Sequence, residues 1–133
     1  MTLFLCLDDN GGMMFGGKRQ SRDRVLIDDM LSLCGEKLNI TAYSEPLFKD
    51  RAHKVSVSSD VLSGGSWFIE NGRLIGDISG VSKIVIYKWN RVYPADVKLS
   101  FSPEKEGFEL TEVYEFAGSS HENITRETYK RRG

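Results

Sequence analysis

Histidine, paired cysteines and net charge are all scarce in this 133-residue sequence, and each scarcity argues against a class of protein. The two histidines, His53 and His121, lie far apart and have no metal-ligand spacing, so we predict no metal site. A zinc-dependent ribonuclease needs clustered His and Asp ligands, and the sequence therefore argues against that role. The net charge of −1 leaves no basic excess to neutralise phosphates, so nucleic acid is not an expected partner.

Long apolar runs are also missing. No stretch approaches the ~18 apolar residues that cross a membrane, and no basic segment precedes a long apolar one as in a signal peptide. Cys6 and Cys34 are interpreted as two small buried thiols, and a disulfide between them is an alternative that nothing requires. We therefore expect a cytoplasmic protein with no membrane partner.

What the sequence does contain is typical of one globular domain over residues 1–133. Hydrophobic residues make up 40% and charged residues 28%, which argues against disorder. A chain of this length can bury roughly two-thirds of its unfolded surface, so it needs no disulfide or metal to fold.

Strand and helix patterns alternate first, and consecutive strands follow. The apolar run 3–7 predicts a buried strand, and Ser21 is placed to cap a helix over 21–34 that Gly35 ends. Further strands are predicted at 38–42, 53–59, 66–69, 83–89, 95–101, 108–117 and 124–131, with helical turns at 44–50 and 72–78. This order predicts an α/β fold with a mixed, mostly parallel central sheet and an antiparallel C-terminal hairpin.

Four glycines lie in residues 11–17, between the first strand and the helix. Gly12 to Lys18 has the spacing of a phosphate-binding loop, but Arg19 follows where that motif needs Ser or Thr to hold magnesium. We therefore interpret the segment as a flexible glycine loop over a pocket.

Charged residues cluster where the predicted helix begins. Arg19 and Arg22 could clamp a phosphate or carboxylate there, because a helix N-terminus favours anions. The alternative, to which we give slightly more weight, is that these arginines and Arg24 pair at the surface with Asp23, Asp28 and Asp29.

Two further segments have candidate residues. Asp23 stabilises the helix wherever its side chain points, and it becomes a candidate proton donor if burial in a cleft raises its pKa. His121 is expected to be an exposed loop residue. The segment 89–94 contains Trp89, Asn90, Arg91 and Tyr93, which are candidates for a ligand or for a homodimer interface.

The order of elements resembles the dihydrofolate reductase family over most of the chain. Asp8 after the first strand and the following Gly12-Met13 resemble that family's strand and mobile active-site loop, and Asp23 resembles its substrate-binding acid. Segments 38–42, 48–59, 68–74 and 128–131 resemble later strands and loops. The resemblance implies a three-layer fold, NADPH as cofactor, and Asp23 as the catalytic acid that anchors a heterocycle such as a pterin.

The chain also departs from that family. A Pro-Trp pair is absent from residues 17–20, and the turn that grips a cofactor phosphate is replaced by residues 41–44, in which Ser44 alone could stand in. The family's double glycine is Asn71-Gly72, and residues 59–66 are too few for its adenosine-side helix. These departures argue against NADPH binding in the usual way.

Two functions follow from these observations. The first is a reductase relative that binds a pterin or nucleotide-like small molecule without the full reductase machinery. Its pocket would contain Asp23 and the candidate ligand-binding residues Met13, Arg19, Ser21, Arg22, Ser44, Asn71 and Gly72. The alternative is a non-catalytic interaction module that uses its surface to form a homodimer or to bind a partner.

Overall fold

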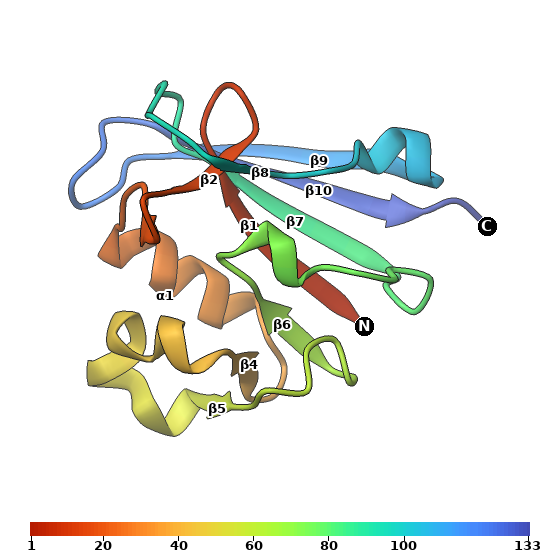
Figure 1. Cartoon of the computed structure of the whole chain (residues 1–133), viewed down its shortest axis with the longest axis horizontal. Coiled ribbons are helices and arrows are strands. Elements are labelled where there is room, and N and C mark those ends of the chain that lie inside the picture. The colour runs from red at the N-terminus through yellow and green to blue at the C-terminus, as the bar shows by residue number, and fades with distance from the viewer.

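A computed structural model describes all 133 residues as two β-sheets and a few helical segments (Figure 1). The strands are β1 (Thr2–Leu7), β2 (Gly12–Phe15), β3 (Lys18–Arg19), β4 (Leu38–Ile40), β5 (Val55–Val57), β6 (Ser66–Phe68), β7 (Lys83–Lys88), β8 (Val97–Lys98), β9 (Phe108–Phe116) and β10 (Ile124–Arg131). The helical segments are α1 (Arg24–Leu33) and the 3-10 segments η1 (Ala42–Lys54), η2 (Gly72–Leu74) and η3 (Pro103–Glu106). None of these helices is long and apolar enough to cross a membrane.

The central sheet has seven strands in the order β5-β4-β6-β1-β7-β10-β9. The five strands from β5 to β7 are parallel to one another, and β10 runs antiparallel to both β7 and β9. The predicted α/β class, the mostly parallel sheet and the antiparallel C-terminal hairpin are therefore confirmed. In Figure 1 the β9–β10 hairpin lies along one side of the molecule and β5 along the opposite side.

Alternate residues of β1 enter two separate cores, one on each face of the central sheet. Phe4 packs with α1 and η1 on one face, whereas Leu3 and Leu5 pack on the other face against the small sheet β3-β2-β8. Burial on both faces explains why β1 is a continuous apolar run rather than an alternating one. Helices thus cover one face, and a second sheet with short turns covers the other.

The glycine-rich segment is not a flexible loop. Residues 12–19 form the β2–β3 hairpin, in which Gly16 and Gly17 make the turn at φ values of 59° and 75°. Those backbone angles favour glycine, and they account for this glycine pair without any phosphate ligand. The hairpin also pairs with β8, so the predicted 95–101 strand contributes only residues 97–98 to a sheet.

The helix begins later than predicted. Asp23, and not Ser21, is its N-cap, because the Asp23 carboxylate accepts hydrogen bonds from the backbone N–H groups of Val25 and Leu26. At the other end Cys34 is the C-cap, one residue before Gly35. Ser21 is left free to contact another element of the fold.

Candidate functional site

Asp23 is the centre of a buried polar cluster where α1 meets the β9–β10 loop. Its side chain is fully buried, and besides capping α1 it accepts hydrogen bonds from the backbone N–H groups of Ser119 (3.0 Å) and Ser120 (2.9 Å). Its Oδ2 lies 3.0 Å from Nδ1 of His121. Every oxygen of this carboxylate is therefore engaged by the protein itself.

Burial does not make Asp23 a proton donor, contrary to the expectation from the sequence. Burial alone would raise the pKa of its carboxyl, but the hydrogen bonds from Ser120, His121 and Ser119 lower that pKa below the ordinary value. The carboxylate is consequently ionised at neutral pH. It stays a charged acceptor in the cluster instead of the predicted acid.

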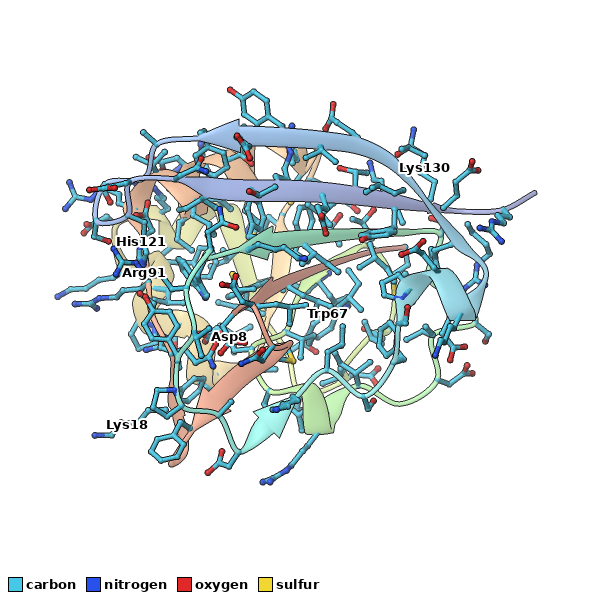
Figure 2. The ribbon with its side chains drawn as sticks, turned by 90° about the horizontal axis from the view of Figure 1, so that it is seen from above. Asp8, Lys18, Trp67, Arg91, His121 and Lys130 are labelled. Carbon is cyan, nitrogen blue, oxygen red and sulfur yellow. The ribbon has the colours of Figure 1, made fainter.

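His121 is buried, not exposed as predicted, and both of its ring nitrogens have partners. Its ring lies against the Trp89 indole, with centroids 4.6 Å apart, and its Nε2 is 2.9 Å from the Ser21 hydroxyl oxygen. The Tyr93 hydroxyl is farther from Nε2, at 3.5 Å. Figure 2 places His121 and Arg91 at one end of the sheet and Lys130 at the other.

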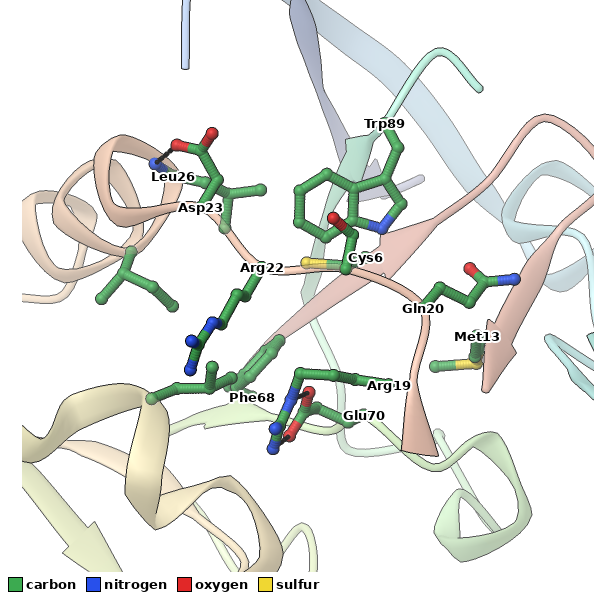
Figure 3. A pocket seen from close by; sticks show the side chains of 13 residues that line it. Cys6, Met13, Arg19, Gln20, Arg22, Asp23, Leu26, Phe68, Glu70 and Trp89 are labelled. Carbon is green, nitrogen blue, oxygen red and sulfur yellow. Dashed lines mark hydrogen bonds and ion pairs between the residues drawn. The ribbon is translucent and has the colours of Figure 1, made fainter. Parts of the chain in front are cut away.

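A second polar cluster joins the β2–β3 hairpin to the segment after β6. Arg19 forms a two-pronged ion pair with Glu70, through Nε to Oε1 at 2.7 Å and Nη2 to Oε2 at 3.1 Å. The Ser44 hydroxyl donates to the same carboxylate at 2.7 Å, and the Tyr43 ring lies 4.6 Å from the Arg19 guanidinium carbon. Figure 3 shows Arg19 and Glu70 facing each other across the hollow from Trp89.

These contacts change the roles predicted for two ligand-binding residues. Ser44 is fully buried and hydrogen-bonded to Glu70, so it cannot reach a cofactor phosphate. Arg19 is held by Glu70 and therefore is not a free clamp for an anion. The predicted surface pairing of the arginines with neighbouring aspartates is also wrong, because Asp28 pairs with Arg51 and Asp29 with Arg126.

The hollow between α1 and the central sheet is nearly filled. Its cavity has a volume of about 20 Å³, and Met13, Ser21 and Asp23 are among its lining residues. That is room for about one or two water molecules. The Asp23 carboxylate points to the start of α1 and away from the Arg19–Glu70 pair, as Figure 3 shows. In this conformation the hollow holds no space for a pterin.

A much larger groove lies on the surface beside this hollow, with a volume of about 630 Å³. Its lining contains four cationic side chains, Arg22, Arg24, Lys49 and Arg51, against the carboxylates of Asp23 and Asp50. Arg51 is paired with Asp28, whereas the other three cations form no ion pair within the chain. The predicted residue Arg22 lies where the groove meets the hollow.

Asn71 and Gly72 have structural contacts. Asn71 caps η2 by accepting from the Arg73 backbone N–H at 3.0 Å. Gly72 is buried, and a Cβ added to it would come within 2.8 Å of the Met13 sulfur. The glycine at 72 is therefore needed for packing against β2.

The segment after β7 is also more engaged than predicted. Trp89 is 4% exposed and belongs to the core on the α1 face, so its ring is not available at a surface interface. Asn90 takes a φ of 59° and donates to the Asn123 carbonyl and the Thr125 hydroxyl. The Tyr93 backbone N–H donates to Asp8. Arg91 is exposed, and its interface role is still a prediction.

Comparison with known proteins identifies the architecture. No family model matches the sequence, and no curated protein matches it. Among solved structures, a dihydrofolate reductase from Enterococcus faecalis, complexed with NADP(H) and RAB-propyl, is similar with a TM-score of 0.66. The match covers 100% of this chain and 97% of that one at 12% identity. The chain has a dihydrofolate-reductase-like fold. The resemblance stated from the sequence is thereby confirmed at the level of the fold.

Sequence reasoning missed the residues that complete both polar clusters of this dihydrofolate-reductase-like chain. His121 is 98 positions from Asp23, and Glu70 is 51 positions from Arg19. The Gly-Ser-Ser-His run at 118–121 predicts a tight polar turn and gives no sign of which element it contacts. No group of three or more His, Cys, Asp or Glu side chains is placed to hold a metal ion.

Proposed function

We propose that this protein binds a small anionic, nucleotide-like molecule in the groove beside α1 and that it lacks reductase activity. The observation that supports this proposal is the gathering of Arg22, Arg24 and Lys49, all without ion-pair partners, around a groove of about 630 Å³. A groove of this size suits a ligand as large as a mononucleotide. Unpaired guanidinium and ammonium groups are the usual ligands of phosphates and carboxylates.

The groove also offers contacts beyond charge. Ser119 lines it, and its hydroxyl accepts from the Arg24 backbone N–H and keeps its own proton to donate to a phosphate oxygen. Pro46 and Leu47 add an apolar wall on which a flat ring could pack. This combination of a cationic end and an apolar wall favours a molecule with a ring and an anionic group over a bare phosphate ion.

Three observations argue against the reductase function suggested by the fold. The hollow that would receive a pterin has a volume of about 20 Å³. Ser44, the proposed phosphate contact, is buried against Glu70, and Asp23 is ionised and fully hydrogen-bonded. The similar solved structure was complexed with NADP(H), and the contacts seen in this chain do not favour the same cofactor here.

A ligand screen read by thermal stability tests the proposal. Nucleoside mono- and diphosphates, NADPH, folates and inorganic phosphate would each be added to the purified protein. A ligand at 100 times its dissociation constant stabilises the fold by about 2.7 kcal/mol, which raises the melting temperature by several degrees. We expect such a shift with a phosphorylated nucleoside, and a weaker shift at high salt because the groove cations are screened.

Charge reversal in the groove provides the matched comparison. The double variant Arg24→Glu, Lys49→Glu should lose the shift, whereas Lys130→Glu should keep it, because Lys130 lies at the opposite end of the sheet (Figure 2). No shift with any anionic compound, or an equal loss in the Lys130→Glu variant, would argue against the groove as the binding site.

The alternative function, a non-catalytic interaction module, is favoured by one observation. Strand β9 pairs with β10 on one side and ends the sheet on the other, and Leu110, Val113 and Tyr114 on it are 43–55% exposed. An uncovered edge strand can pair with a second copy of the chain. Light scattering should then give a dimer that Val113→Lys separates, and a monomer at every concentration would count against this alternative.

A further inference from the structure

The Ser21, His121 and Asp23 side chains form one hydrogen-bonded line, which the anion-binding proposal does not use. Asp23 Oδ2 lies 3.0 Å from Nδ1 of His121, and Nε2 of the same ring lies 2.9 Å from Oγ of Ser21. Asp23 is ionised and can only accept, so Nδ1 must donate. In the tautomer whose single ring proton is on Nδ1, Nε2 is an acceptor for the Ser21 hydroxyl. This is the arrangement that activates a serine nucleophile.

We propose that Ser21 is a nucleophile, with His121 as its general base and Asp23 as the residue that positions His121, and that the chain hydrolyses small carboxylic esters. The burial pattern fits these roles. The Asp23 and His121 side chains are 0% and 5% exposed, whereas Ser21 is half-buried and lines the hollow that meets the groove. The base is thus shielded from water, and the nucleophile is the more exposed end of the line.

The ring orientation of His121 is fixed by more than its two hydrogen bonds. Trp89 packs against the imidazole with its plane tilted by 30°, and Asp23 is held in turn by the backbone N–H groups of the 118–121 turn and of α1. The Ser120 hydroxyl lies 3.2 Å from Nδ1 and the Tyr93 hydroxyl 3.5 Å from Nε2. The Ser21 contact is shorter than the Tyr93 contact, so Ser21 is the hydroxyl that His121 can deprotonate.

Donors for a developing oxyanion also lie next to the nucleophile in the chain. The backbone N–H groups of Ser21 and Arg22 donate to no acceptor within the protein. Free backbone N–H groups at the nucleophile are what acyl-transfer sites use to stabilise the tetrahedral intermediate. The Arg22 side chain lines the same hollow as Ser21.

The reaction balances with water as the co-substrate. Ser21 Oγ bonds to the ester carbonyl carbon as its proton moves to Nε2 of His121. The bond from that carbon to the alcohol oxygen then breaks, and the proton passes from Nε2 to the leaving oxygen. Water attacks the resulting acyl-serine, giving its proton through His121 back to Ser21 and releasing the carboxylic acid. An anionic group on the ester would lie in the cationic groove, and this one point rests on the proposed function.

Covalent labelling tests the nucleophile without needing the groove. A neutral alkyl fluorophosphonate forms a bond from phosphorus to an activated serine oxygen and releases fluoride. Intact-mass analysis and peptide mapping of the purified chain should find one adduct, at Ser21. Ser21→Ala should not be labelled, and His121→Gln should be labelled at least about 10²-fold more slowly, the usual contribution of a general base. His53→Gln is the matched control, because His53 is exposed and lies outside the cluster.

The substrate class is tested separately by turnover. A neutral p-nitrophenyl ester and a matched ester with a free carboxylate should both be hydrolysed by the wild type and not by Ser21→Ala. Arg24→Glu, Lys49→Glu should keep fluorophosphonate labelling and lose any preference for the anionic ester. If the double variant is labelled normally but no longer prefers the anionic ester, the groove binds the anionic group and Ser21 acts independently of it. If the wild type is not labelled at all, the nucleophile proposal fails, whatever the groove binds.

The positioning role of Asp23 is tested by the labelling rate of a variant that is still folded. In Asp23→Asn the new amide would donate to Nδ1 and turn Nε2 into a donor, so labelling should fall about 10²-fold or more even where circular dichroism shows a folded protein. The proposal is overturned if Ser21 takes no adduct, if labelling survives Ser21→Ala unchanged, or if a labelled wild type hydrolyses neither ester.

Discussion

Asp23 is the residue on which the largest number of contacts converge, and its charge should be visible in the stability of the protein. Its pKa is lowered on folding, so its ionised form favours the folded state at pH values above the unfolded pKa of about 4. That contribution is lost as the pH falls below about 4 toward the folded pKa. Neutralising the side chain removes the same contribution at neutral pH.

We therefore predict that Asp23→Asn lowers the free energy of unfolding at pH 7 by about 2 kcal/mol, and Asp23→Ala by more, because the capping N–H groups lose their acceptor. Urea unfolding from pH 7 to pH 3 should show the gap between wild type and Asp23→Asn narrowing as the pH falls. Asp9→Asn, at an exposed site, should change stability by less than about 0.5 kcal/mol. If the difference in free energy of unfolding did not change with pH, the negative charge of Asp23 would not be what stabilises the fold.

The buried Arg19–Glu70 pair should stabilise the fold more than an exposed pair does. The two side chains are 22% and 7% exposed, and Glu70→Ala would leave the guanidinium and the Ser44 hydroxyl without their acceptor. We expect a loss of about 3 kcal/mol in the free energy of unfolding. Asp28→Ala breaks the more exposed pair with Arg51 and should cost about 1 kcal/mol or less. Equal losses in the two variants would contradict the buried-pair argument.

The loop between β9 and β10 packs closely against the Asp23 carboxylate. A Cβ on Gly118 would collide with the Asp23 carboxylate, whose Cγ would lie 2.8 Å away. Because that carboxylate is held from several sides, we predict that Gly118→Ala displaces the loop and destabilises the fold by about 1–3 kcal/mol. Gly35→Ala, where a Cβ meets open space, should be neutral or slightly stabilising. Thermal unfolding compares the two, and equal melting temperatures would contradict the close fit.

The elements that could be predicted from the sequence are those whose pattern is set by burial. The sequence predicts the ends of strands β1, β7, β9 and β10 to within one residue. A strand buried on both faces gives a continuous apolar run, and a strand buried on one face gives alternation. The β2–β3 hairpin was missed. Its pairing with β8 depends on residues about 80 positions away, and glycine-rich runs suit both a loop and a tight turn.

At the scale of the whole molecule, the fold was predicted and most of the site was not. The order of elements constrains which strands become neighbours, so the reductase-like architecture was visible from one sequence. The partners of Asp23 and Arg19 depend on how distant loops dock, and single-residue patterns do not contain that information. Ser21 shows the consequence, because it was predicted as a helix cap and instead contacts a histidine 100 positions later.

Despite its reductase-like fold, the protein is not expected to reduce dihydrofolate. A hollow of about 20 Å³, a buried Ser44 and an ionised, fully hydrogen-bonded Asp23 together argue against pterin binding and against Asp23 as a proton donor. We expect the purified protein to leave dihydrofolate and NADPH unchanged, as followed by the absorbance of NADPH.

An active dihydrofolate reductase assayed in parallel would verify the reagents. The Glu70→Ala variant would test whether freeing Arg19 is enough to give activity. Removing that side chain frees Arg19 and enlarges the hollow, yet it restores neither the acid nor the phosphate contact, so this variant should be inactive too. Steady NADPH consumption by the wild type that depends on dihydrofolate would overturn this prediction. It would mean that the hollow widens to admit substrate, because a volume of about 20 Å³ leaves no room for a pterin.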